Sequence, residues 1–448
     1  MTVVVGALAT AFVVAVAAGT LRDGADVVGH RTAPRVAATD DLSFALADMD
    51  AQVANVLLAG GDSALSAVHD AALQGYQQRR AQADADLQQA ISVAGTDDVA
   101  QRTIRTLLDQ LGDYEARVAN VVLLNDSEKG PAGRPAPDVL DQYRRATALM
   151  GTMLGSAGQL GDANTRVLEG SYASTRHDVS VDEVWLGVCA VVLLGSLVGL
   201  QVLLRVTMRR RLNPALLAAT VVAVAVVVGG FVTDSAAADQ LRVARHDAFD
   251  SLQALQGARA ISTDANADES RYLLDPQRAD VYQQAFLSKS LQLADVHVTG
   301  INDYDAALAR AVDAYRADRN TIRFGGRFGD ELHNITFPGE REAAVATVTA
   351  YQAYQRDDRV LRDRARTDLR QAIQFDTSPA SGNSDGDFTA YDKQLATLID
   401  INQRSFDTAI GRAESTLAGW SNWLPYTAFG IIAVLCLLGV RPRLAEYR

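Results

Sequence analysis

Cysteine, histidine pairs and nucleotide-binding motifs are scarce or missing in this chain of 448 residues. Its two cysteines, Cys189 and Cys436, both lie in apolar runs, so the sequence predicts neither a disulfide framework nor a thiolate metal site. The six histidines show no HxxxH or HExxH spacing, and we find no phosphate loop, GxSxG or Rossmann motif. We therefore expect a protein that is not an enzyme, with no catalytic residue, no metal and no cofactor.

Positive charge is also limited. The net charge is −12, and only three of the basic residues are lysines. Because binding to phosphate backbones needs a basic surface, this balance argues against a nucleic-acid partner.

Long apolar runs, by contrast, are present. Four are about 20 residues long, the length that crosses a bilayer, at 1–20, 184–204, 214–233 and 422–440. None has a charged residue in its interior, which disfavours a transporter subunit. The first run lacks the positive start of a cleaved signal peptide, so we expect a retained span.

Arginines beside these runs predict the topology. The link 205–213 contains Arg209, Arg210 and Arg211, and the tail 441–448 contains Arg441 and Arg443. Positive residues near the ends of spans stay in the cytoplasm, so we place the link and the tail inside. Residues 21–183 and 234–421 then lie on the extracytoplasmic side of the cell membrane.

An internal repeat relates the two long segments. Shifting the sequence by 216 residues places His30 on His246 and Asp48 on Asp264, without gaps over the first outer helix. Apolar residues at helical spacing predict about four helices in each segment and no strand. We expect an all-α membrane protein with four transmembrane helices and two extracytoplasmic antiparallel helical bundles related by internal duplication.

One pair of repeat positions carries polar residues on the predicted core stripe. They are Gln52 in the first bundle and Asp268 in the second. A carboxylate in a bundle core needs a partner, and Arg271 or Arg259 is close enough in sequence to provide it. These residues then form a polar pocket or switch. The plainer interpretation, which we favour, is a solvated end far from the membrane.

The stretch ELHNITFPGERE and the glycines before it interrupt the helical pattern. This insertion has no counterpart in the first bundle and is predicted to be non-helical. It predicts a docking site for a partner, with anchoring side chains at Phe324, Phe328, Asn334, Phe337 and Pro338. The alternative is a long connection that packs on its own bundle, and the sequence does not separate the two.

Several segments resemble the actinobacterial GlnX family over essentially the whole chain. They are the link RVTMRRRLNPALLAATV, the segment ARHDAFDSLQALQGARAISTDANADESRYL, the motif ELHNITFPGEREAA and the tail RPRLAEYR. The resemblance implies a protein that connects an extracytoplasmic glutamate/glutamine-binding lipoprotein with the cytoplasmic Ser/Thr protein kinase G. It implies a role in amino-acid sensing and nitrogen metabolism, but transfers no site residues.

We therefore expect a non-enzymatic transmembrane signal transducer whose cytoplasmic output is the set of link and tail arginines. The cytoplasmic parts are too small to hold a kinase or cyclase, so the signal must pass to a separate protein. Two alternatives stay open: a sensor whose bundle binds a small molecule directly, and a cell-envelope scaffold.

Overall fold

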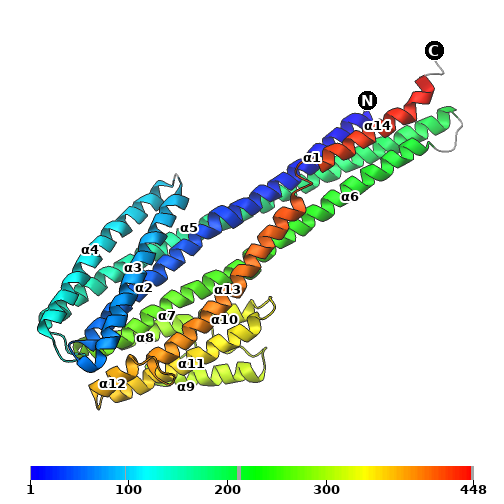
Figure 1. Ribbon diagram of the computed structural model, residues 1–448. Helices are drawn as coiled ribbons and strands as arrows, with labels where there is room; N and C mark the ends of the chain where they lie inside the picture. The colour runs from blue at the N-terminus through cyan, green and yellow to red at the C-terminus, as the bar shows by residue number, and fades with distance from the viewer. Residues whose placement is uncertain (1, 96, 209–212, 445–448) are drawn as a thin grey trace. The chain divides into compact units, whose positions relative to one another are not determined.

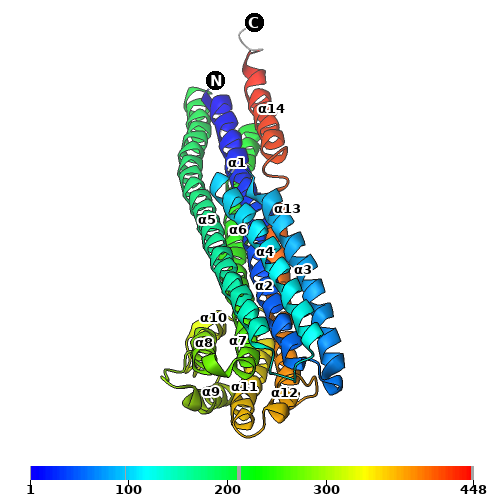
Figure 2. The ribbon, with the colours of Figure 1, turned by 90° about the vertical axis from the view of Figure 1, so that its left-hand side faces the viewer.

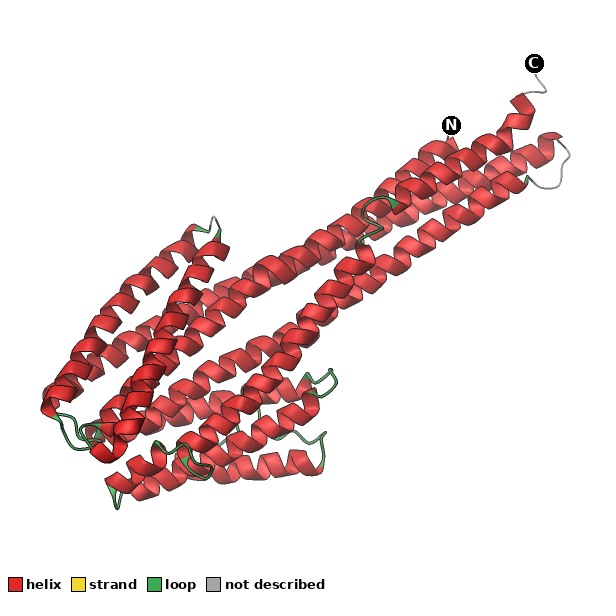
Figure 3. Cartoon of the chain, viewed as in Figure 1, coloured by secondary structure: helices red, strands yellow, loops and turns green. Residues whose placement is uncertain are grey.

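The computed structural model describes residues 2–95, 97–208 and 213–444. Within these ranges nearly every residue is helical and no strand forms (Figure 3). The only extended pairing there is one antiparallel bridge between Asp295 and Gly325. The all-helical prediction is therefore confirmed. The helices run in the order α1 Thr2–Asp26, η1 Val27–Thr32, α2 Ala33–Ala59, η2 Ser63–Leu65, α3 Ser66–Ala94, α4 Asp98–Glu128, α5 Pro137–Met208, α6 Pro214–Arg242, η3 Val243–Phe249, α7 Asp250–Leu274, η4 Pro276–Arg278, α8 Ala279–Leu293, α9 Ile301–Ala317, α10 Gly326–His333, α11 Glu340–Ala365, α12 Leu369–Asp376, α13 Ser384–Leu417 and α14 Leu424–Leu444.

Chain contacts divide the protein into two compact units (Figure 1). We call Met1–Thr32, Arg166–His246 and Phe406–Arg448 the apolar unit, and Ala33–Thr165 and Asp247–Ser405 the bundle unit. The two predicted outer domains thus contribute their larger parts to a single compact unit.

Four helices pack on one another in the apolar unit. The buried core comes from α1, α5, α6 and α14, with residues such as Ala7, Leu197, Ala219 and Ile432. Three helices are long and apolar enough to cross a membrane, and they include the predicted spans 1–20, 184–204 and 214–233. The apolar part of α14, Leu424–Gly439, is shorter, so the fourth span stays a prediction.

Two of the long helices contain a π-helical turn. η1 starts at Val27 and η3 at Val243, and the interval between them, 243 − 27 = 216, equals the predicted repeat spacing. The extra residue in a π turn often marks a functional position in a helix. The two turns agree with the duplication, which itself stays a prediction.

The first half of the bundle unit is the predicted set of four helices, α2, α3, α4 and the first part of α5. Their apolar stripes meet in one core that contains Leu46, Leu87, Leu111 and Met150. The boundaries have local causes: the Asp97 side chain accepts hydrogen bonds from the Val99 and Ala100 N–H groups and caps α4.

The second half contains more helices than predicted. We expected four, which correspond to α7, α8, α11 and α13; the structure adds α9 and the short helices α10 and α12 (Figure 2). The predicted non-helical insertion is also partly wrong, because Gly326–His333 forms α10. Most of these helices surround a second core rich in aromatic residues, including Phe286, Tyr351 and Tyr391.

The two halves of the bundle unit share a core at one end. α12 belongs to the second half by sequence, but its Ala372, Ile373 and Phe375 side chains are buried in the core of the first half. Leu273 and Leu274 at the end of α7 join the same cluster. Since both halves bury apolar side chains in one cluster, they are held together by hydrophobic packing.

Candidate functional site

A buried arginine on α7 links carboxylates from the two halves of the bundle unit. Arg271 is 4% exposed, and its Nη2 donates to Asp50 Oδ2 of α2 at 2.5 Å. Its Nη1 donates to Asp268 Oδ1, also at 2.5 Å. Lys289 on α8 donates from Nζ to Asp268 Oδ2 at 2.5 Å and contacts Asp264 Oδ2 at 2.6 Å. We call Asp50, Asp264, Asp268, Arg271 and Lys289 the Arg271 network.

Three helices of the first half converge on Asp50. Its carboxylate comes from α2, the Tyr114 hydroxyl of α4 donates to Oδ1 at 2.8 Å, and the Thr147 hydroxyl of α5 donates to Oδ2 at 3.1 Å. Burial, with the Asp50 charge next, raises the pKa of Tyr114 well above its ordinary value. Tyr114 therefore stays a protonated donor, and Asp50 is fully enclosed by donors from both halves.

Neighbouring charges favour the ionised forms of Arg271 and Asp264. Burial by itself lowers the pKa of Arg271, but Asp268 and Asp50 outweigh it and raise that pKa well above its ordinary value. Burial opposes ionisation of Asp264, yet Lys289 and Arg271 together lower its pKa. Each charge has a partner, so the network acts as a clamp between helices, and breaking one pair leaves a buried charge uncompensated.

A second ion pair lies beside this network. Arg144 on α5 holds Asp275, just after α7, through two hydrogen bonds of 2.8 and 2.7 Å. Asp275 is 1% exposed. A bidentate arginine–carboxylate pair has fixed geometry as well as charge, so it also fixes the end of α7 against α5.

The predicted pairing of Asp268 with Arg271 is found in the structure, whereas Arg259 pairs with Asp392. The solvated end that we favoured is wrong, because Asp268 is 2% exposed. Gln52, its repeat mate, does not join the network. Its Nε2 donates to Asp48 at 2.8 Å, and its side chain lines a cavity of about 160 Å³.

The predicted docking residues divide into two groups. Phe324 and Phe328 are 4% and 1% exposed and belong to the aromatic core, so as surface anchors they are wrong. Phe337 is partly exposed and Pro338 is exposed. Asn334 donates from Nδ2 to the Asp247 carbonyl and to Ser251, both at 3.0 Å, and so holds the turn to the start of α7.

A buried glutamate explains why the helical pattern breaks at this insertion. The Glu340 carboxylate at the start of α11 accepts hydrogen bonds from the Thr336 and Phe337 N–H groups at 2.7 and 2.8 Å. Glu331 on α10 is 1% exposed, and burial, reinforced by the Glu340 charge, raises its pKa to about 7. The turn between α10 and α11 is therefore built around two carboxyl groups, and only its tip reaches the surface.

The predicted output residues fall at the limits of the described chain. Arg209, Arg210 and Arg211 lie outside the described residues. Arg441 and Arg443 lie in α14, but their side chains are not described. Their role stays a prediction.

One group of potential metal ligands occurs among the described residues. Asp26, His30 and Glu414 of the apolar unit lie close together. His30 Nε2 lies 3.0 Å from Glu414 Oε1, and Asp26 pairs with Arg31 at 2.8 Å. Because His30 is exposed, Asp26 and Glu414 are only partly buried, and all three already have partners, we assign no metal to them.

Sequence reasoning missed Asp50, Lys289 and the hydroxyl groups around them. A signal for Asp50 was present, since it occupies the stripe Leu46, Asp50, Val53 and Leu57 at helical spacing. Lys289 lies on another helix 21 residues beyond Asp268, and no local pattern connects the two.

The comparisons with known proteins support a sensor. Residues 24–173, a third of the chain, match the family model described as actinobacterial sensor domain. The matched segment contains the whole first half of the bundle unit, Ala33–Thr165, with α2, α3, α4 and the first part of α5. No curated protein and no solved structure matches the chain. The match suggests a sensing role for this part of the chain, and the three apolar helices are compatible with a membrane protein.

Proposed function

We propose that this protein is a non-enzymatic transmembrane signal transducer, in which the bundle unit receives a signal and the helices shared with the apolar unit pass it on. One observation carries the proposal: Val3–Ala59 is helical throughout, with its first part in the apolar unit and its second part in the sensor-matched bundle unit. Pro137–Val206 and Pro214–Leu274 are continuous in the same way. A shift of such a helix at one end is transmitted to the other end.

The resemblance to the GlnX family supports a more specific version of this proposal. The signal is glutamate or glutamine status, delivered by an extracytoplasmic binding lipoprotein, and the receiver is the cytoplasmic Ser/Thr protein kinase G. The docking surface is the exposed tip of the α10–α11 turn, with Phe337 and Pro338. The output surface is the arginine-rich link and tail. The relay requires that each partner bind the two helix arrangements with different affinity.

Affinity capture tests the proposal. The intact protein is isolated from native membranes with and without added glutamate and glutamine, and its companions are identified by mass spectrometry. We expect a solute-binding lipoprotein and a cytosolic kinase whose recovery changes with the amino acid. Recovery of neither would contradict the relay.

A pair of variants locates the docking surface. Phe337→Asp places a charge on the exposed turn, and Leu123→Asp places one on the exposed face of α4, where Leu123 is 68% exposed. We expect Phe337→Asp to lose the lipoprotein while Leu123→Asp retains it. Equal recovery with both variants would exclude the α10–α11 turn as the docking site.

A further inference from the structure

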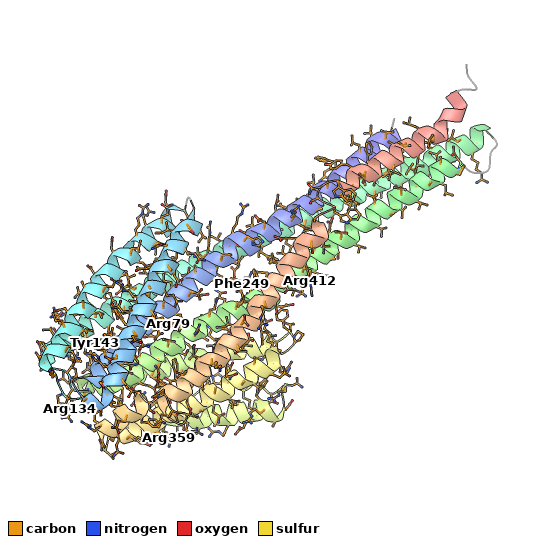
Figure 4. All side chains as sticks on the ribbon, viewed as in Figure 1. Arg79, Arg134, Tyr143, Phe249, Arg359 and Arg412 are labelled. Carbon is orange, nitrogen blue, oxygen red and sulfur yellow. The ribbon has the colours of Figure 1, made fainter. Side chains whose placement is uncertain are left out.

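A polar cavity of about 160 Å³ lies inside the bundle unit, between α2, α3, α7 and α13. A neighbouring cavity of about 280 Å³ shares Gln52, Asn55 and Asp385 with it. Arg79, labelled in Figure 4, reaches the first cavity from α3. Neither cavity belongs to the Arg271 network, because none of that network's residues lines them.

Two polar groups face the first cavity with unused hydrogen-bonding capacity. Thr263 is 2% exposed, and its Oγ1 has no hydrogen-bond partner among the described residues. Asp385 lies in the first turn of α13, and no cation in the described part of the chain pairs with its carboxylate. A buried hydroxyl without a partner is uncommon in folded proteins, and a ligand in the cavity accounts for it.

The other charges around the cavity are already neutralised. Asp48 pairs with Arg79, whose Nε lies 2.5 Å from Oδ2. Asp392 is held by Arg259 through two hydrogen bonds of 2.6 and 2.8 Å. These two acid–arginine pairs cancel, and Asp385 remains as the one carboxylate lining the first cavity that no cation in the described part of the chain pairs with. A ligand that matches the charge of this cavity therefore carries a single positive charge.

The lining of the neighbouring cavity indicates what the uncharged part of that molecule is. The neighbouring cavity is lined mainly by small apolar side chains, which are Ala67, Val68, Ala71, Ala72 and Pro379. A bare divalent cation does not fit, because it needs six or more oxygen ligands and only one free carboxylate is present. An aliphatic chain with one charged end matches both the apolar wall and the single charge.

We propose that these two cavities form a binding site for a small aliphatic ammonium ion. The Asp385 carboxylate holds the nitrogen, the Thr263 hydroxyl is a further acceptor, and the carbon chain lies along the alanine-rich wall of α3. This site goes beyond the relay and does not depend on the docking of a binding protein, because all of its residues come from the bundle unit.

The pH dependence of binding follows from the surroundings of Asp385. Burial, with the nearby Asp48 charge next, raises the pKa of Asp385 to about 6. The other charged groups lining the cavity are Asp48 from α2, Arg79 from α3 and Asp392 from α13. Asp376, at the end of α12, also interacts with the Asp385 carboxylate, and its own pKa is raised to about 7, mainly by burial. The ammonium ion binds the ionised carboxylate, so affinity is full above pH 7 and falls as the pH drops below about 6.

Calorimetry on the intact protein in detergent tests the site, with n-butylammonium chloride as the probe. At pH 7.5 we expect saturable binding of n-butylammonium, none of n-butanol or glutamine, and about ten-fold or greater weakening in Asp385→Asn, where the charge-assisted contact is lost. Thr263→Val should weaken binding by a smaller factor. Asp313→Asn, at an exposed position, is the matched control and should bind as the wild type does.

Two results would overturn the proposal. One is the absence of n-butylammonium binding to the folded wild-type protein at pH 7.5. The other is equal affinity of Asp385→Asn and Asp313→Asn, together with an affinity that does not change between pH 5 and pH 7.5. Either result leaves the relay intact, because partner capture is measured separately.

Discussion

At the scale of single residues, loss of Arg271 should strongly destabilise the fold, because it is buried and paired with Asp50 and Asp268. In Arg271→Met, Asp50 remains buried with only hydroxyl donors, and Asp268 keeps only Lys289. Breaking a buried ion pair on one side typically costs about 3–5 kcal/mol, so we expect a loss of that order in the free energy of unfolding. Denaturant titration in detergent measures it.

An exposed pair provides the control for this variant. Arg366 and Asp363 form a 3.0 Å pair with side chains that are 60% and 64% exposed. Arg366→Met should change the free energy of unfolding by less than about 1 kcal/mol. Equal effects of the two substitutions would mean that the Arg271 network does not stabilise the fold.

Glu331 gives a prediction in which the size of a substitution's effect on stability depends on pH. Burial raises its folded pKa from 4.5 to about 7, so the folded state binds a proton that the unfolded state releases. Its destabilising contribution is full above pH 7 and disappears as the pH falls toward 4.5. We expect Glu331→Gln to raise the free energy of unfolding at pH 8 by on the order of 2 kcal/mol and to have little effect at pH 5. A stability difference independent of pH would contradict this.

The residue scale also shows what the sequence can and cannot predict. The Asp268–Arg271 pair was predicted because both residues lie on one helix, three positions apart. Asp50 is 221 residues from Arg271, and nothing in the local pattern specifies their contact. Phe324 and Phe328 looked like surface anchors because their segment breaks the helical pattern, yet a short helix places both in a core.

At the scale of elements, α12 packs against a glycine in the loop before α5. Gly133, in the loop before α5, has φ +66°, and its N–H donates to the Leu58 carbonyl. A Cβ at this position would lie 2.5 Å from the Ile373 side chain on α12. Gly133→Ala combines a strained backbone with a shifted Ile373 side chain, so we expect a loss of about 1–3 kcal/mol in the free energy of unfolding.

Gly151 is the matched control for that substitution. It lies inside α5, and no atom lies within 4 Å of the position its Cβ would take. Alanine is the better helix former, so Gly151→Ala should stabilise the protein by about 0.5–1 kcal/mol. The same denaturant titration measures both variants, and opposite signs are the expected result. Destabilisation by both would mean that loop geometry is not the cause.

Helix number was predictable only where the helices are long. The four helices of the first half have stripes of several turns, and each was found. α10 and α12 have eight residues each, too short for a periodic pattern to be distinguished from a turn. α9 is long enough, and its stripe Ile301, Tyr304, Leu308 and Val312 has helical spacing, but the prediction of about four helices in each segment left no place for it.

At the scale of the whole molecule, the proposed relay depends on relative movement of the first and last helices. In the apolar unit, Gly29 of η1 packs against Ile410 of α13, with Ile410 Cγ2 2.6 Å from the position of a Gly29 Cβ. The His30–Glu414 pair lies beside this contact at 3.0 Å. A cross-link here would hold η1 and α13 together without altering the bundle unit.

The final prediction uses Gly29→Cys with Ile410→Cys in a background where Cys189 and Cys436 are replaced by alanine. The close approach of the two positions favours a disulfide on oxidation. We expect oxidation to abolish the amino-acid-dependent change in kinase recovery and reduction to restore it, because a fixed pair of helices cannot populate two arrangements. Recovery of the lipoprotein should be unaffected, since its proposed docking site lies in the bundle unit. An oxidised protein that still changes its kinase recovery with glutamine would show that the signal does not pass between these two helices.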